Sequence, residues 1–411
     1  MVFAAPVFLF FYLPICLLVY LAIYAIGRKT DWRPRANLFL FLASLFFYTW
    51  GEQTLVCVLL FSTFVDYFCA QVISRKREQG LNSRLALTAS IATNLTTLVI
   101  FKYFNFAADN VQAVLSSLGI QNSIAASVPQ IALPLGISFY TFQSMSYSID
   151  VYRGDVKATD RFIDFACYVS LFPQLVAGPI VRYRDVAEDL VERNLSWDSF
   201  RSGVERFIIG LSKKMLLANT VATPVDTIFA QQPGNISMLL AWVGIVLYAL
   251  QIYFDFSGYS DMAIGLGRMF GFRFPENFAH PYSARSFQDF WRRWHISLST
   301  WFRDYVYIPL GGNRGSGFRT SFNLWMVFLL CGLWHGASWN FVAWGAMHGA
   351  LLTLERSRFG KLIQSLPIVF QHAYVVLFLG ITWACSVHPI GPMQWTTLLP
   401  WRGSPTHPAL D

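Results

Sequence analysis

A histidine embedded in apolar sequence is the residue of this chain best suited to moving a proton. His335 lies in the string LWHGASWN (residues 333–340), with apolar stretches on both sides. An ionisable side chain at membrane depth is costly, so by default it marks a functional site, and imidazole titrates nearest to neutral pH. We predict that His335 is catalytic and that Trp334 and Trp339, one helical turn beyond His335, contact substrate. A histidine that only packs between helices is the alternative.

A second histidine lies in an aromatic and basic string, FWRRWHISLSTWFRDY (residues 290–305). At helical spacing one face carries Trp291, Trp294, His295, Leu298, Phe302 and Tyr305, which suits a helix at the membrane interface. On that face desolvation favours the neutral form of His295. We predict a catalytic or substrate-positioning histidine; a histidine that pins the helix to a carbonyl is an equal alternative. The other predicted substrate contacts of this string are Trp294, Ser297, Arg303 and Tyr305.

Two carboxylates flank a small polar turn in the string FDFSGYSDMA (residues 254–263). Paired carboxylates can do acid–base work, but Asp255 and Asp261 are six residues apart and lie on different faces of a continuous helix. A joint role would need a break at Gly258. Capping of a helix that begins near Asp261, by Asp255 or Ser257, is the favoured interpretation. We expect Asp255, Ser257 and Asp261 to line a polar, substrate-binding cavity.

A glycine-rich loop, GGNRG (residues 311–315), carries the remaining candidates, Asn313 and Arg314. Its backbone N–H groups could hold the phosphate or pantetheine of a donor, although a plain cytoplasmic turn fits the pattern better. His348 follows His335 by thirteen residues, on a different face of a continuous helix, and is predicted to be structural. The six cysteines contain no C-x-x-C pair, so we expect neither a metal site nor disulfides.

The composition places these residues in a membrane. Of the 411 residues, 55% are hydrophobic and only 13% are charged, whereas soluble domains carry about 25% charged residues. The net charge of +8 comes from basic residues in short loops between apolar runs, which indicates contact with membrane lipids and excludes nucleic acid as a partner. We predict an all-α polytopic membrane protein, a single domain with about ten transmembrane helices plus re-entrant or interfacial helices.

The apolar runs are expected to form the spans and broken helices of the bundle. They cover residues 5–26, 37–50, 55–70, 85–101, 131–149, 162–180, 207–221, 237–256, 323–334, 339–354 and 368–385. Basic clusters at 28–35, 75–84 and 153–161 predict cytoplasmic loops and an external N-terminus. Prolines and glycine predict a broken or re-entrant element at 162–180, and polar residues predict an outer amphipathic helix within 109–127.

Residues 254–348 resemble the catalytic core of the membrane-bound O-acyltransferase (MBOAT) superfamily, closest to its bacterial alginate O-acetylase branch. The strings that carry the resemblance are FDFSGYSDMAIGLG, ENFAHPYSARSFQDFWRRWHISLSTWFRDYVYIPLGGNRG, CGLWHGASWNFVAWGAMHG, LPLGISFYTFQSMSYSIDVYRGD and FPQLVAGPIVRY. The resemblance implies that His335 matches the family's catalytic histidine and His295 its second position, filled by histidine or asparagine. Members of the family usually run longer, so residues 389–411 are expected to be a tail or a truncated end.

The resemblance also implies a helical ring around a tunnel in the bacterial inner membrane. The implied reaction moves an acyl group, preferentially acetyl, from acetyl-CoA or another cytoplasmic thioester to an exported polysaccharide through periplasmic acetyl-transfer proteins. No bound cofactor is expected. The alternative is a multi-pass transporter or lipid-linked glycan flippase that relays protons through Asp66, Asp150, Asp164 and Asp255. The absence of an internal repeat counts against it, and a non-catalytic assembly scaffold is a third reading.

Overall fold

The structure, a computed structural model, describes residues 1–27, 29–119, 130–231 and 236–387. Within these residues every regular element is a helix, which confirms the predicted all-α class. The chain forms two compact units, residues 1–284 with 289–306 and residues 285–288 with 307–411.

The first unit begins with the helices expected from the first apolar runs. Its leading elements are η1 (Phe8–Tyr12), α1 (Leu13–Gly27), α2 (Arg33–Glu52), η2 (Gln53–Leu55), α3 (Val56–Glu78) and α4 (Arg84–Ser117). The predicted turn between α2 and α3 is confirmed at Gln53, whose φ is 45°. A separate outer helix was predicted within residues 109–127. For residues 109–117 this prediction is wrong, because α4 continues through these polar residues to Ser117 without a break. Residues 120–127 lie outside the described residues.

Five helical segments in the described part of the chain are long and apolar enough to cross a membrane. They are Phe8–Gly27, Arg33–Glu78, Arg84–Ser117, Met238–Met269 and Ile368–Ser386. Large apolar side chains such as Phe10, Leu18 and Phe61 are exposed on their outer faces. That distribution fits a lipid environment, because soluble proteins rarely expose such broad apolar surfaces. The predicted total of about ten spans is not confirmed.

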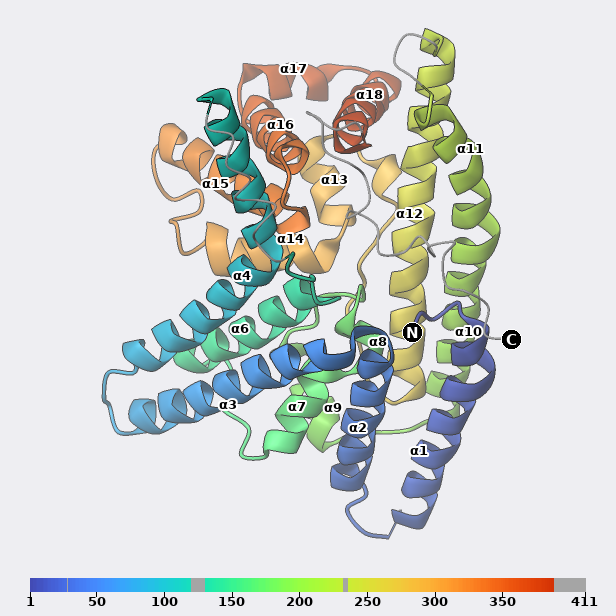
Figure 1. Ribbon diagram of the computed structural model, residues 1–411, viewed down its shortest axis with the longest axis vertical. Helices are drawn as coiled ribbons and strands as arrows, with labels where there is room; N and C mark the ends of the chain where they lie inside the picture. Colours follow the sequence, from blue (N-terminus) through green and yellow to red (C-terminus); the bar gives the residue numbers. More distant parts are fainter. Residues whose placement is uncertain (28, 120–129, 232–235, 388–411) are drawn as a thin grey trace. The chain divides into compact units, whose positions relative to one another are not determined.

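α6 (Ile137–Arg153) is a polar helix in the interior of the first unit, beside α3 and α4 (Figure 1). It begins after Gly136, whose φ of 76° favours glycine. Thr141, Gln143, Ser144, Ser146, Ser148 and Asp150 are all nearly inaccessible. Polar groups are therefore gathered inside and apolar groups outside, which is the arrangement that a bilayer favours.

The proline-containing run at 162–180 is broken, as predicted. It forms α7 (Phe162–Ser170) and the single turn α8 (Phe172–Leu175), and α9 (Tyr183–Val191) follows. The side-chain amide of Gln174 donates to the carbonyl of Tyr168, and the Tyr168 hydroxyl donates to the carbonyl of Val181. Side chains thus satisfy carbonyls that the broken helix leaves without helical partners.

A buried arginine ties several of these helices together. Arg193 is 2% exposed, donates to the Tyr20 hydroxyl over 2.9 Å and also donates to the side-chain oxygen of Asn37. Its guanidinium lies 4.1 Å from the ring centre of Phe272. Asn37 in turn donates to Asp164, so a hydrogen-bonded chain links α2, α7 and the segment that follows α9.

Replacing Arg193 with methionine should destabilise this unit strongly. The change keeps the apolar part of the side chain but removes the hydrogen bonds that the buried Asn37 and Tyr20 oxygens accept. We expect the free energy of unfolding to fall by about 3 kcal/mol. The measurement is the thermal unfolding temperature of the purified protein in detergent. Arg201→Met is the matched control, because the Arg201 side chain is 71% exposed and its ion pair in the described part of the chain is with Glu205 on the same helix. Equal melting temperatures for the two variants would contradict this stabilising role of Arg193.

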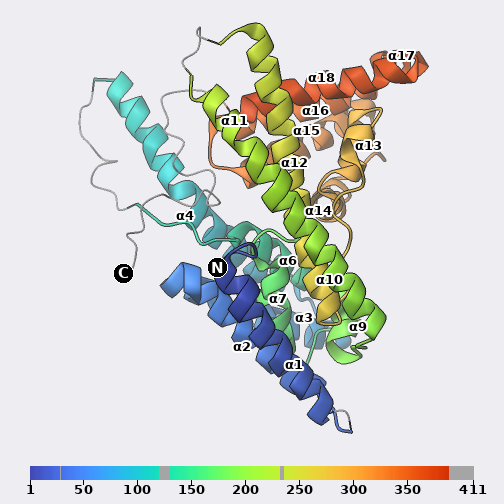
Figure 2. The same cartoon turned by 90° about the vertical axis from the view of Figure 1, so that its right-hand side faces the viewer.

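Two long helices form the other side of the first unit. α10 (Trp197–Ser212) continues through a π-helical turn, η3 (Lys213–Ala218), into α11 (Asn219–Phe229), and packs along α12 (Met238–Met269) (Figure 2). The short helix predicted at 207–221 is therefore part of one longer element. A Cβ on Gly203 would lie only 2.7 Å from the carbonyl oxygen of Gly265, so the absence of side chains permits this close approach.

The second unit contains α15 (Gly317–His335), α16 (Trp339–Glu355), α17 (Arg358–Ser365) and α18 (Ile368–Val387). α15 and α16 form an antiparallel hairpin, and α18 packs on α16. The three apolar runs predicted in this part of the chain are confirmed as helices. α17 was not expected, although Phe359, Leu362 and Ile363 recur at helical spacing, because eight residues are too few to cross a membrane.

Candidate active site

The segment that was expected to be one interfacial helix is broken at His295. It forms α13 (Phe287–Arg293), α14 (Ile296–Phe302) and η5 (Arg303–Tyr307), and His295 between them has a φ of 44°. The predicted single aromatic face is therefore wrong, and its members are buried at 8% exposure or less. The backbone of the preceding loop causes the break, since Ala279 donates to the carbonyl of Arg293 and Ile296 donates to that of Asn277.

The side chain of Asn277 organises the surroundings of His295. Its Oδ1 lies 3.1 Å from His295 Nδ1 and accepts from Ser297 Oγ over 2.9 Å, while its Nδ2 donates to Ser260 Oγ over 3.0 Å. Because an amide oxygen only accepts, Nδ1 of His295 carries the proton and Nε2 is the basic nitrogen. Ser297 Oγ also accepts the N–H of Ile180 over 2.9 Å. His295 is thus held in one tautomer and one orientation.

Apolar rings surround this imidazole, which is 1% exposed. Phe256 lies edge-on with its ring centre 4.7 Å from that of His295, and the ring of Phe139 is 6.5 Å away. Of the predicted substrate contacts, Ser297 therefore belongs to the histidine's hydrogen-bond network. Trp294 is buried and stacks on Phe290, with ring centres 5.6 Å apart. Asn277 was missed, because an asparagine in a loop has no periodicity that would single it out.

The two carboxylates of α12 lie on a continuous helix, so the predicted capping by Asp255 or Ser257 is wrong. Asp255 pairs with Lys214 over 2.6 Å, and Asp261 pairs with Lys213 over 2.6 Å. The π-helical turn of η3 explains how two adjacent lysines both reach α12, because it widens the helix locally. Ser257 is buried between these two levels. The predicted polar lining is thus a set of ion pairs between helices.

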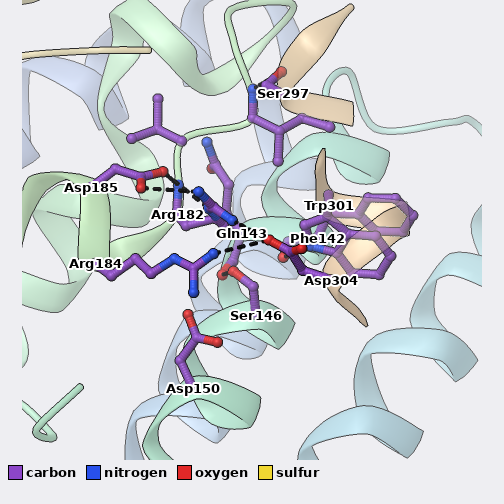
Figure 3. Close-up of polar contacts among 12 residues, drawn as sticks. Phe142, Gln143, Ser146, Asp150, Arg182, Arg184, Asp185, Ser297, Trp301 and Asp304 are labelled. Carbon is purple, nitrogen blue, oxygen red and sulfur yellow. Dashed lines mark hydrogen bonds and ion pairs between the residues drawn. The ribbon is translucent and has the colours of Figure 1, made fainter. Parts of the chain in front are cut away.

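A second polar cluster surrounds Asp304 in η5 (Figure 3). One oxygen of this carboxylate accepts from Arg182 over 2.8 Å and from Arg184 over 3.1 Å, and the other accepts from Arg303 over 2.7 Å. Burial acts to raise the pKa of Asp304, but the hydrogen bond from Arg303 and the charges of all three arginines outweigh it and hold the pKa below its usual value. We call Arg182, Arg184, Arg303 and Asp304 the arginine cluster.

The arginine cluster should make the protein's stability depend on pH in the acidic range. A carboxylate whose pKa is lowered by folding stabilises the fold above its unfolded pKa of about 3.9 and loses this effect as the pH falls through the lowered value. Asp304→Asn should therefore melt at a lower temperature than the parent at pH 7, and the difference should shrink as the pH falls below about 3.9. A difference that stays constant across this range would contradict the assignment.

A line of buried polar groups runs along α6 beside this cluster. The hydroxyl of Tyr305 donates to Asp150, with both carboxylate oxygens 2.8 Å away. Ser146 lies one helical turn before Asp150 on α6, and Gln143 lies one turn before Ser146. Next to Gln143, the ring of Phe142 stacks on that of Trp301, with ring centres 3.7 Å apart. Both polar atoms of the Gln143 amide are buried without a partner among the described residues. Arg303 and Tyr305, predicted to bind substrate, thus lie at one end of this line.

In the second unit His335 is the last residue of α15, and an extended Gly336 follows it. The ring centres of Trp334 and Trp344 each lie 5.0 Å from that of His335. The side chain is partly exposed, whereas His348 is completely buried. Trp339, the first residue of α16, is 55% exposed. The predicted residues Trp334 and His335 therefore lie just before the turn between α15 and α16, and Trp339 lies just after it.

His348 lies nearer to His335 than the sequence predicted. The expected different face assumed one continuous helix, but the chain reverses at 336–338 and α16 returns beside α15. Trp344 lies between the two imidazoles, with its ring centre 5.0 Å from that of His335 and 4.6 Å from that of His348. His348 thus packs against the aromatic residue that faces the predicted catalytic histidine.

The glycine-rich loop at 311–315 is a tight turn that is hydrogen-bonded to the residues before it and to α15. The N–H groups of Gly311 and Gly312 donate to the carbonyls of Ile308 and Tyr307 just before the loop, and that of Arg314 donates to Gly311. Asn323 donates to the carbonyl of Gly312 over 2.9 Å. These amides are therefore engaged, which favours the plain turn over a phosphate cradle. Asn313 and Arg314 are exposed.

The sequence matches one protein-family model, that of the membrane-bound O-acyltransferase family, over residues 44–388. The chain belongs to this family. The match covers both units and includes the turn at His335 and the break at His295. The family resemblance and the predicted class of enzyme are thereby confirmed at the level of the family.

Several curated proteins are similar to this chain. The probable alginate O-acetylase AlgI of Pseudomonas aeruginosa is 46% identical over 87% of this chain and 66% of its own length. The peptidoglycan O-acetyltransferase of Helicobacter pylori is 35% identical over 93% of this chain and 76% of its own length. The teichoic acid D-alanyltransferase of Bacillus subtilis is 29% identical over 53% and 58%. The chain spans about two thirds of the length of the alginate relatives.

Proposed function

We propose that this chain is an O-acetyltransferase of the bacterial inner membrane that acts on an exported polysaccharide. The observation that carries the proposal is the membership of the MBOAT family together with His335 at an accessible helix end. The relatives named above are an alginate O-acetylase, a peptidoglycan O-acetyltransferase and a teichoic acid D-alanyltransferase. Each of these names describes transfer of an acyl group to a polymer. The two acetyl-transferring relatives are more similar in sequence to this chain than the D-alanyltransferase is. Acetyl on an alginate-type polysaccharide is therefore the favoured cargo.

In the proposed reaction the Nε2 or Nδ1 atom of neutral His335 takes a proton from an acceptor hydroxyl or thiol. The acceptor atom attacks the carbonyl carbon of an acetyl thioester, and the carbon–sulfur bond then breaks. The proton passes from the imidazolium to the departing thiolate, so the histidine returns to its starting form. The aromatic rings around His335 limit the access of water, which would otherwise hydrolyse the donor. A periplasmic partner would carry the acetyl group onward to the polymer.

The role proposed for His295 is to position the reacting groups. Its tautomer is fixed by Asn277, so its basic nitrogen is presented in one direction only. It can orient the acceptor or bind a polar group of the thioester. No bound cofactor takes part in this proposal, and acetyl-CoA or another acyl thioester is consumed as a substrate.

The test is acetyl transfer by the purified full chain in lipid nanodiscs. Radiolabelled acetyl-CoA is supplied together with mannuronate oligosaccharides, muropeptides or teichoic acid fragments, with and without a periplasmic extract. We expect release of free CoA and ester-linked label, highest with mannuronate oligosaccharides. A folded protein that neither releases CoA nor labels any acceptor would overturn the proposal.

The transporter alternative receives no specific support. The four carboxylates that it would use are held separately, for instance Asp66 by Ser90 and Asn94 and Asp255 by Lys214. Among the described residues no hydrogen bond or ion pair joins one of these four carboxylates to another.

A further inference from the structure

An open cleft lies between two loops of the first unit, beside the packed helices α2, α7 and α9 (Figure 1). The segment at the start of α2 contributes Asp31, Arg33 and Pro34, and the loop between α6 and α7 contributes residues 155–161. The volume of the cleft is about 540 Å³. Pockets that hold small ligands span about 300–1,000 Å³, so the space suits a small polar group. We call this space the loop cleft.

The loop cleft adjoins a segment that is long and apolar enough to cross a membrane. That segment begins at Arg33, which lines the cleft together with Pro34. Exposed apolar side chains follow Pro34 at intervals of four residues, since Leu38, Leu42 and Phe46 are 43%, 54% and 56% exposed. Residues four apart are neighbours on one face of a helix. An exposed apolar stripe therefore leads from the loop cleft along α2.

The charges that line the loop cleft are balanced. Four acidic and four basic side chains contribute to the lining. Arg161 and Arg184 pair with carboxylates over 3.6 and 3.1 Å. In the described part of the chain no ion pair or hydrogen bond engages the exposed side chains of Asp155, Lys157 and Asp160. One cation and two carboxylates of the same loop are thus available to a ligand.

Hydrogen bonds to the backbone hold this loop in place. The N–H of Asp155 donates to the carbonyl of Asp150, and the N–H of Thr159 donates to the hydroxyl of Tyr147, each over 2.9 Å. The amide of Gln71 donates to the carbonyl of Thr159 over 2.6 Å. Because the backbone is already fixed, a ligand would not have to order the loop, and binding would lose less conformational entropy.

Arg33 supplies a second cation to the loop cleft. Its Nη1 atom lies 3.8 Å from Oδ1 of Asp31, which is too long for a hydrogen bond. Within the described residues its Nε atom also has no hydrogen-bond partner. A guanidinium has five donors and binds a phosphate well. Arg33 and Lys157 can therefore hold a phosphate, while Asp155 and Asp160 can accept hydrogen bonds from an ammonium group.

We propose that the loop cleft binds the headgroup of a phospholipid that carries a primary ammonium, as phosphatidylethanolamine does. Its phosphate lies at Arg33 and Lys157, its ammonium at Asp155 and Asp160, and an acyl chain follows the apolar stripe of α2. A purely anionic headgroup would be repelled by the two aspartates. A choline headgroup has no N–H donor for them. Neither predicted catalytic histidine lines the cleft, so this lipid is a ligand of the fold and not a substrate.

The first experiment measures the affinity of the purified full chain for single lipids by native mass spectrometry in detergent. The probes are phospholipids with the same acyl chains and an ethanolamine, choline or glycerol headgroup. The ethanolamine lipid should bind about tenfold more tightly than the other two, because only its ammonium donates charge-assisted hydrogen bonds to the aspartates. Glycerophosphoethanolamine, which lacks the acyl chains, should compete poorly. Competition by this soluble compound at equal concentration would overturn the lipid as the occupant.

The second experiment repeats these measurements on variants of the loop cleft. Lys157→Gln should weaken the ethanolamine and choline lipids alike, about tenfold, because both carry the phosphate. Asp160→Asn should weaken only the ethanolamine lipid, to the affinity of the choline lipid. Lys361→Gln on α17 and Asp198→Asn on α10 remove the same charges at other exposed positions and should change neither affinity.

The melting temperature supplies an independent measurement on the same variants. The ethanolamine lipid should raise the melting temperature of the parent and of both control variants, since a ligand that binds only the folded chain stabilises it. The increase should be smaller in Lys157→Gln and in Asp160→Asn. Equal affinity of the parent for the ethanolamine and choline lipids, a preference for the glycerol headgroup, or unchanged affinities in both cleft variants would overturn the proposal.

Discussion

Replacing His335 with alanine should abolish acetyl transfer while the protein still folds. A positioned general base contributes about 10²- to 10⁴-fold to a rate, and the activity should fall by at least this factor. The fold should survive, because His335 is partly exposed at the end of α15 and its ring contacts are with the surfaces of Trp334 and Trp344. The measurement is release of CoA and labelling of the acceptor, together with the melting temperature.

Two further variants make the result specific. His335→Gln keeps hydrogen bonding and most of the volume but cannot take up a proton, so it should be as inactive as the alanine variant. His372→Ala, in α18 of the same unit, removes another partly exposed imidazole and should retain activity. If His335→Gln keeps more than about a tenth of the activity, His335 is not the base.

Replacing His295 should give two different outcomes that depend on the new residue. The backbone at this position has a φ of 44°, a region that asparagine tolerates and that alanine disfavours by about 1–2 kcal/mol. An asparagine amide can also donate to Asn277, as Nδ1 of His295 does. We therefore expect His295→Asn to retain activity within about tenfold and His295→Ala to lose about a hundredfold or more, because only the alanine loses both the conformation and the hydrogen bond.

The pair of variants separates positioning from proton transfer. If His295 only positions the reacting groups, the acidic limb of the pH–rate profile should be the same in His295→Asn and in the parent. Asn277→Ala should resemble His295→Ala, since it removes the acceptor that fixes the tautomer. An asparagine variant as inactive as the alanine variant, at equal stability, would show that the imidazole itself takes part in the reaction.

The sequence predicted those parts of the fold that depend on neighbouring residues. Long apolar runs form helices at the expected places, and Pro173, Gly178 and Pro179 break the run at 162–180, because propensity and hydropathy act over a few residues. The membrane environment follows from the low charge content. The sequence also singled out His335 and His295, because each lies in a distinctive aromatic string, residues 333–340 and 290–305.

The partners of these residues are set by contacts that join distant parts of the chain. Asn277 and Ala279 break the helix at His295, although local periodicity favours a continuous helix there. Asp304 meets Arg182 across more than a hundred residues of sequence, a contact that no local pattern records. Likewise the two lysines of η3 pair with Asp261 and with Asp255 on α12, and Asp255 resembled a helix cap in the sequence.

The sequence by itself therefore determined that this chain is a helical membrane protein of a particular family and which two imidazoles to examine. Only the tertiary structure decided which tautomer His295 holds, that Trp344 lies between His335 and His348, and that three arginines converge on Asp304. The physical reason is that hydropathy and helix propensity are summed along the chain. Hydrogen bonds, ion pairs and ring contacts depend on distances in space, which the folded backbone alone fixes.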